Sequence, residues 1–133
     1  MLINKYNYST FFYIFIIFHL IIWVAIPSLT NSNLPLDTIE ALAWGNDFEW
    51  GNNKHPPLSV LSVEIFFFIF SNNDFAYYLL SQIFILINFI FIFEIGKIFF
   101  KDNLSRIFII FLTSLIFYYS YNSTEFNVNI CVL

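Results

Sequence analysis

Long apolar runs alternate with polar segments along this chain, and the lengths of the runs indicate membrane-spanning helices. Residues 11–26 are apolar except for His19, and flanking residues extend this run to 8–29. Two further runs cover residues 75–95 and 104–121, with a short polar turn between them. A helix needs about 20 predominantly apolar residues to cross a bilayer. The pattern therefore predicts three transmembrane helices, at residues 8–29, 75–95 and 104–121.

The region between the first two runs has a different composition. Residues 30–74 are rich in Asn, Pro, Trp and acidic side chains. Within them, residues 58–70 are apolar but few, and they include Glu64. An apolar stretch of about 10–14 residues is more often interfacial or re-entrant than spanning. We therefore expect a structured loop with short interfacial helices, and we interpret the apolar residues 128–133 as the start of a further element.

The composition agrees with an all-α integral membrane protein. Of the 133 residues, 59% are hydrophobic and 11% are charged, whereas soluble domains average about 25% charged residues. The formal net charge of −4 leaves no basic stripe for nucleic acid, so the expected partner is the lipid bilayer. A single cysteine, Cys131, excludes both an intrachain disulfide and a cysteine-based metal site. The bias toward Phe, Ile and Asn suggests a bacterial source.

The basic residues predict how the chain is oriented in the membrane. One of them, Lys5, precedes the first run, and three cluster around the turn that joins the second and third runs: Lys97, Lys101 and Arg106. Short cytoplasmic segments carry the excess of Lys and Arg. We therefore expect a cytoplasmic N-terminus and an outside loop at residues 30–74, in a bacterial inner membrane. A cleaved signal peptide is the competing interpretation of the first run, but its end lacks a small-x-small cleavage pattern, which favours an uncleaved anchor.

The outside loop contains a set of residues suited to chemistry. Asp37 and Glu40 are three positions apart, so on a helix they share one face. A carboxylate near the apolar rings of Trp44 and Trp50 could accept a proton from an acceptor hydroxyl. Farther along the loop, Lys54 and His55 could supply positive charge for a phosphate, since both side chains bind anions when protonated.

Each of these residues also has a purely structural interpretation. Asp37 could cap a helix that starts at Thr38, with Glu40 reaching back as in a capping box. Lys54 and His55 could form a solvated turn, and the two tryptophans could be interfacial anchors, which are common at the headgroup level. Spacing alone leaves capping and catalysis equally open.

Two other classes of function are alternatives to an enzyme. The first is a small non-enzymatic polytopic membrane protein whose outside loop binds a partner through Trp44 and Trp50. The second is a transporter fragment with an ion path along His19, Gln82 and Glu94, because ionisable groups inside a membrane are often functional. The nearness of Glu94 to Lys97 favours an ordinary ion pair over such a path.

The order of these pieces resembles the opening of a known family of membrane enzymes. An N-terminal anchor, Asp37-x-x-Glu40, a Trp-Gly pair and a His55-Pro56-Pro57 turn before a surface helix are similar to the polytopic GT-C glycosyltransferases of the protein O-mannosyltransferase and aminoarabinose transferase type. The likeness covers residues 10–133. It implies the N-terminal part of a GT-C fold, in which the first outside loop builds the active site at the outer membrane face.

The resemblance also implies a reaction and roles for particular residues. The donor in such families is a sugar on a polyprenyl phosphate, which is transferred to an acceptor. Asp37 matches the carboxylate that activates the acceptor, and Glu40 is a second carboxylate. The implied substrate-binding residues are Lys54, His55, Trp44 and Trp50. No cofactor is implied, and two carboxylates without a third ligand predict no tightly bound divalent metal.

The chain departs from the family pattern in two ways. Relatives commonly have adjacent Asp and Glu, whereas Thr38 follows Asp37 here. Relatives also have many more helices, and three spans can hardly enclose a polyprenyl chain. We therefore expect the chain to be inactive by itself, as the front of a longer enzyme or the product of a split or frameshifted gene.

Overall fold

The computed structural model of the chain describes residues 5–45 and 57–132, and within these ranges every regular element is a helix. In chain order the elements are α1 (Lys5–Thr30), α2 (Leu36–Gly45), α3 (Pro57–Phe70), α4 (Asp74–Phe99), α5 (Asn103–Ser114), the 3-10 turns η1 (Phe117–Tyr119) and η2 (Tyr121–Thr124), and α6 (Val128–Val132). The fold class predicted from the sequence, an all-α membrane protein, is confirmed.

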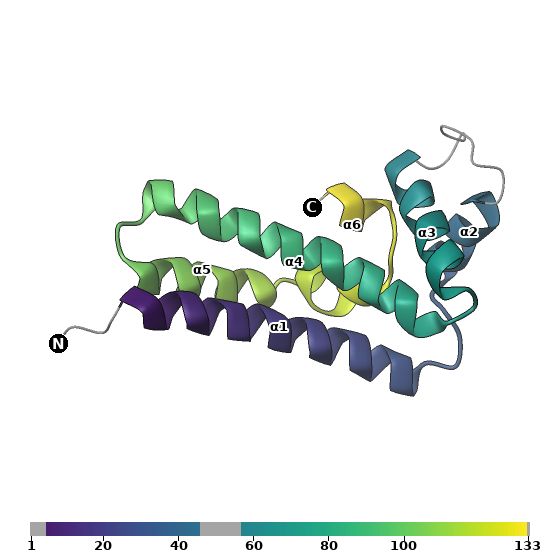
Figure 1. Cartoon of the computed structure of the whole chain (residues 1–133), viewed down its shortest axis with the longest axis horizontal. Helices are drawn as coiled ribbons and strands as arrows, with labels where there is room; N and C mark the ends of the chain where they lie inside the picture. The colour runs from purple at the N-terminus through teal and green to yellow at the C-terminus, as the bar shows by residue number, and fades with distance from the viewer. Residues whose placement is uncertain (1–4, 46–56, 133) are drawn as a thin grey trace.

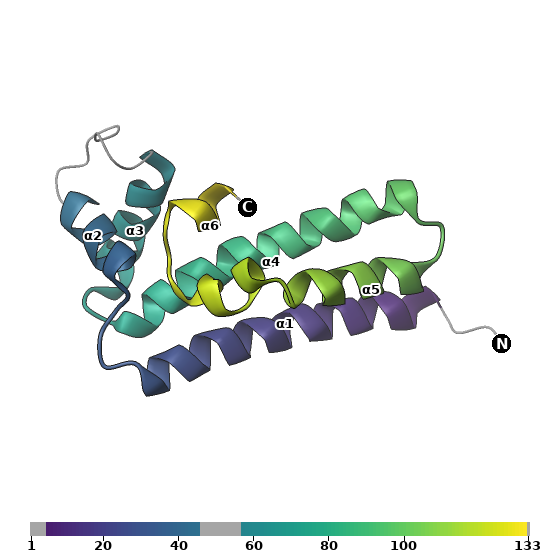
Figure 2. The same ribbon diagram turned by 180° about the vertical axis from the view of Figure 1, so that it is seen from behind.

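The helices α1 and α4 run side by side along the bundle (Figures 1 and 2). Each has 26 residues, or about 39 Å of helix, which exceeds the roughly 30 Å of bilayer hydrocarbon. Their outward faces expose large apolar side chains, among them Phe18, Ile21 and Phe91. Both helices are long and apolar enough to cross a membrane, and the chain is an integral membrane protein.

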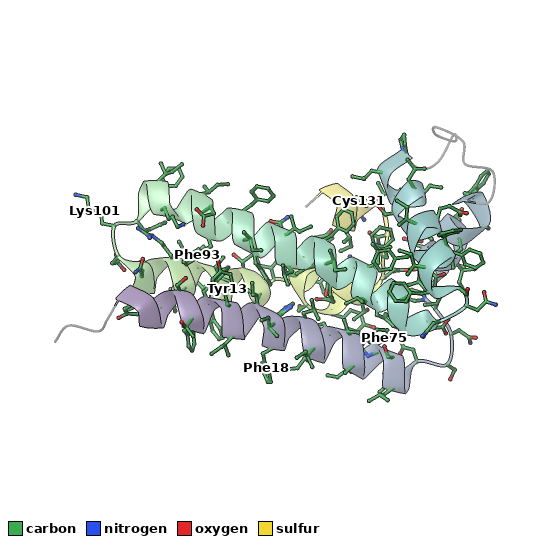
Figure 3. All side chains as sticks on the ribbon, in the orientation of Figure 1. Tyr13, Phe18, Phe75, Phe93, Lys101 and Cys131 are labelled. Atoms are coloured by element: carbon green, nitrogen blue, oxygen red, sulfur yellow. The ribbon has the colours of Figure 1, made fainter. Side chains whose placement is uncertain are left out.

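Aromatic rings fill the space between these two helices and the segment that follows them. Phe12 of α1 stacks on Phe93 of α4, with ring centroids 4.2 Å apart. Phe93 points into the bundle, whereas Phe18 points away from it (Figure 3). The buried ring of Phe89 lies 5.4 Å from that of Tyr119. Such packing holds transmembrane helices together, because surrounding lipid supplies no hydrophobic drive for their association.

The third apolar run is not the continuous helix that its composition predicts for residues 104–121. The helix α5 ends at Ser114, and the η1–η2 segment leaves it at an angle of 85°. The 12 residues of α5 cover about 18 Å, which is only part of the hydrocarbon thickness. Hydroxyl groups mark the break: Ser114 donates to the Phe111 carbonyl and Ser120 to the Ile116 carbonyl. Such local bonds compete with regular helix.

The two ends of the bundle are built differently. The helices α2 and α3 pack together at the end where α1 finishes and α4 starts (Figure 1). The α4–α5 turn lies at the opposite end, where Asp102 accepts a hydrogen bond from the Ser105 N–H at 2.7 Å and Arg106 donates to the Phe100 carbonyl. Hydrogen bonds from the Ser105 side chain and backbone lower the pKa of Asp102 below its usual value. The α1–α2 connection and this turn are thus separated by the length of the bundle.

This arrangement predicts that the two connections lie on opposite sides of the membrane. In a Cys131→Ser background, Ser32→Cys and Lys101→Cys should react with a membrane-impermeant maleimide from opposite faces of sealed vesicles, because both side chains are exposed. Phe18→Cys, on the outward face of α1, should resist the reagent until detergent is added. Labelling of both end positions from the same face would overturn this arrangement.

Candidate functional site

The N-terminal end of α2 is held by residues far along the chain. The N–H of Asp37 donates to Oε1 of Glu125 at 3.2 Å. The buried hydroxyl of Thr38 donates to the carbonyl of Phe126 at 3.1 Å. The first N–H groups of a helix have no partner inside the helix, so a carboxylate there satisfies one of them. These two bonds attach the loop helix to the segment that follows η2.

The start of α2 differs from the capping interpretation of the sequence. The helix begins at Leu36, and the Pro35 carbonyl already accepts the N–H of Ile39 at 3.1 Å. Asp37 therefore lies within the first turn, and the carboxylate of Glu125 takes the position of the cap. A negative charge is favourable there, since the helix dipole is positive at its N-terminus.

A cavity of about 320 Å³ opens beside Glu125. The last turns of α1, the α1–α2 connection and η2 form its walls. Trp23 and Tyr121 contribute aromatic surface, and four lining residues contribute hydroxyl or amide groups: Thr30, Asn31, Asn122 and Thr124. Among the residues that line it, Glu125 is the one with a charged side chain. Aromatic surface with a few convergent polar groups is typical of small-molecule sites.

The turn that carries Glu125 is anchored to α4. The Ser81 hydroxyl donates to the Ser123 carbonyl at 2.6 Å. Nε2 of Gln82 donates to the same carbonyl at 3.0 Å and to the Ser123 hydroxyl at 2.9 Å. All three side chains are buried. Irregular backbone at membrane depth requires such partners, because lipid offers no hydrogen bonds.

The structure places some of the predicted site residues together and separates others. Asp37 is half-buried in the first turn of α2, beside Glu125, and Glu40 follows half-buried one turn later. Trp44 lies in the last turn of α2 with 45% of its surface exposed, and it does not line the cavity at Glu125. The remaining predicted binding residues, Trp50, Lys54 and His55, lie outside the described residues.

Sequence reasoning missed Glu125, which it placed in a polar tail. The available signal was its isolation, since Glu125 is the single acidic residue after Asp102. It also interrupts a strongly apolar stretch together with a run of Asn, Ser and Thr. A carboxylate in such a setting is a functional candidate by default. Its proximity to Asp37 could not be anticipated, because 88 positions separate them.

The polar residues of the spanning helices do not line up as an ion path. Gln82 is buried, whereas Glu94 is exposed and bonded to Lys97 at 2.5 Å. Twelve residues of helix, or about 18 Å, separate Gln82 from Glu94. In the described ranges, no group of three or more His, Cys, Asp and Glu side chains is placed to hold a metal. The expectation of no tightly bound metal stays a prediction.

Comparison with known families decides the class of protein. The model of the family described as dolichyl-phosphate-mannose-protein mannosyltransferase matches residues 54–133, which is more than half of the chain. The chain belongs to this family. It is thus a member of a family of membrane glycosyltransferases, in agreement with the resemblance seen in the sequence. No curated protein and no solved structure matches the chain.

The extent of the match matters for the site. It begins at Lys54 and continues through α3, α4 and the bent segment, so that it includes Glu125. Asp37, Glu40 and Trp44 precede the matched residues. The matched residues therefore include the Glu125 side of the candidate site but not the α2 side. The hydrogen bond between the Asp37 N–H and Glu125 joins the two sides.

The docking of α2 can be tested by removing one hydroxyl. Thr38→Val leaves the Phe126 carbonyl buried without its partner, which should lower the free energy of unfolding by about 1–3 kcal/mol. Thr113→Val is the matched control, because its hydroxyl bonds only to the Ile109 carbonyl one turn back in α5. Reversible unfolding in bicelles would measure both. Equal losses for the two variants would show that the contact does not stabilise the fold.

Proposed function

We propose that this chain forms the acceptor-activating part of a membrane glycosyltransferase that moves a sugar from a polyprenyl-phosphate donor to an acceptor at the outer face of the membrane. The observation that carries the proposal is the hydrogen bond between the Asp37 N–H and the Glu125 carboxylate. It brings the first turn of α2, which carries Asp37, next to Glu125, and Glu125 lines a cavity at the end of the spanning helices. Membership in the mannosyltransferase family supports the class of reaction.

In the proposed reaction, Asp37 is the general base. Its carboxylate takes the proton of the acceptor hydroxyl while the acceptor oxygen bonds to the anomeric carbon of the sugar. The bond between that carbon and the donor phosphate oxygen breaks, and polyprenyl phosphate leaves with the electron pair. Proton transfer of this kind contributes typically 10²–10⁴-fold to a rate. Glu40, one turn along α2, is the second carboxylate of the site.

The charges divide the substrate between two places. Glu125 gives the cavity a negative charge, so the cavity suits the hydroxyl groups of a sugar or acceptor and disfavours a phosphate. We assign the donor phosphate to Lys54 and His55, whose positive charge would bind the phosphate throughout the reaction. Trp44 and Trp50 precede these two residues in the sequence and would cover apolar parts of the substrate. No cofactor takes part in this scheme.

The basic residues suggest which face carries the site. Lys97, Lys101 and Arg106 lie around the α4–α5 turn, at the end of the bundle opposite α2 and α3. Cytoplasmic connections carry the excess of Lys and Arg. We therefore place the N-terminus in the cytoplasm and the cavity on the outer side, in a bacterial inner membrane.

Substitution of Asp37 tests the proposal in the protein as the cell makes it. Asp37→Asn, introduced into the chromosomal gene with an N-terminal tag, should lower transfer of mannose from polyprenyl-phosphate mannose in isolated membranes by about 100-fold or more. The exposed carboxylate of Asp74, at the start of α4, provides the control: Asp74→Asn should leave the rate unchanged. Immunoblotting of the tag gives the amount and the size of the polypeptide. Undiminished transfer by Asp37→Asn would exclude it as the base.

The donor-phosphate assignment makes a different kinetic prediction. His55→Ala should raise the KM for polyprenyl-phosphate mannose more than it lowers kcat, because it removes a contact made in both ground and transition states. The same membranes and donor titration measure both constants. A fall in kcat with an unchanged KM would place His55 at the reacting atoms and overturn the assignment.

A further inference from the structure

A buried polar layer connects α1, α4 and η2 in the middle of the apolar bundle. Its members are His19, Gln82 and Ser123, of which Gln82 is 1% exposed and His19 8%. Both hydrogen bonds from the amide nitrogen of Gln82 go to Ser123. Two buried atoms in this layer, Oε1 of Gln82 and Nε2 of His19, have no hydrogen-bond partner in the described part of the chain. Unpartnered polar atoms are costly in such surroundings.

The chemistry of the two atoms is complementary. A backbone carbonyl only accepts hydrogen bonds, so the Ser123 carbonyl fixes the Gln82 amide with its nitrogen toward Ser123 and its oxygen away. That oxygen needs a donor. A neutral histidine donates through one ring nitrogen, and the His19 ring lies beside the Gln82 side chain and edge-on to Phe89 of α4, at 5.1 Å. The His19 ring also lies beside the backbone of Tyr119. Of these neighbours, Oε1 of Gln82 is the buried side-chain oxygen that lacks a partner, so we assign the ring proton to Nε2.

We propose that His19 and Gln82 are positioning residues for Glu125. Nε2–H of His19 donates to Oε1 of Gln82, the amide nitrogen of Gln82 holds Ser123, and Ser123 fixes the turn that presents Glu125 to α2. The relay runs from the first span through the second span to the bent segment. Its effect on sugar transfer rests on the proposed function, whereas its effect on the contact between Glu125 and Asp37 does not.

The amide hydrogen of Asp37 reports on the relay directly. Its protein partner is Glu125, so its exchange with deuterium should accelerate when the Glu125 turn loosens. With the chain in lipid nanodiscs, Gln82→Leu should accelerate this exchange about tenfold. Asn88→Leu is the matched control. It removes a side-chain amide from the same helix, but this amide accepts a hydrogen bond from the Tyr119 hydroxyl and does not contact Ser123, so the exchange rate at Asp37 should stay unchanged.

Variants of His19 test the first step. His19→Leu should accelerate exchange at Asp37 in the same direction as Gln82→Leu, and His19→Gln should restore the parent rate because it returns a side-chain N–H donor. If Gln82→Leu does not fold, Ser81→Ala removes one donor to the same Ser123 carbonyl with a smaller change in volume and should accelerate exchange.

The exchange rates of these variants distinguish the relay from its alternatives. Unchanged exchange in the folded Gln82→Leu or Ser81→Ala protein, or equal acceleration by Asn88→Leu, would overturn the relay. Acceleration by Gln82→Leu without any effect of His19→Leu would remove His19 from it. Faster exchange together with undiminished sugar transfer by Asp37→Asn would leave the relay standing and reject the proposed function.

Discussion

The lack of hydrogen-bonding solvent inside a bilayer is the constraint on which the rest of this structure depends. Straight helices such as α1 and α4 satisfy their own backbone, but the segment after α5 bends by 85° and cannot. Ser81 and Gln82 meet that need by bonding to the backbone and side chain of Ser123. Ser81 and Gln82 of α4 thus supply the hydrogen-bond partners that irregular chain inside the bundle needs.

The same constraint explains where the site forms. Because the bent segment turns away from the direction of α5, its end reaches the loop helix α2, where Glu125 and the Phe126 carbonyl accept hydrogen bonds. A straight third helix would have no reason to meet α2. The cavity at Glu125 therefore depends on the break in the helix, and the break depends on α4.

The sequence predicts the parts of this fold that obey local rules. The lengths of the apolar runs predict α1 and α4, and the short run with Glu64 predicts a helix distinct from them, α3. The bend after Ser114 could not be predicted, because residues 104–121 are as apolar as a spanning helix and the partners that stabilise the break lie on another helix. Asp37 and Trp44 were recognised as candidates by residue type, but only the folded chain shows that Asp37 meets Glu125 and that Trp44 lies away from it.

The span of 88 residues between Asp37 and Glu125 has a consequence for biogenesis. During synthesis the residues of α2 are made before those of η2, so the N–H of Asp37 stays bonded to water until the bent segment reaches it. The site is thus assembled last, after the membrane helices are in place. An incompletely inserted chain would lack the contact between Asp37 and Glu125.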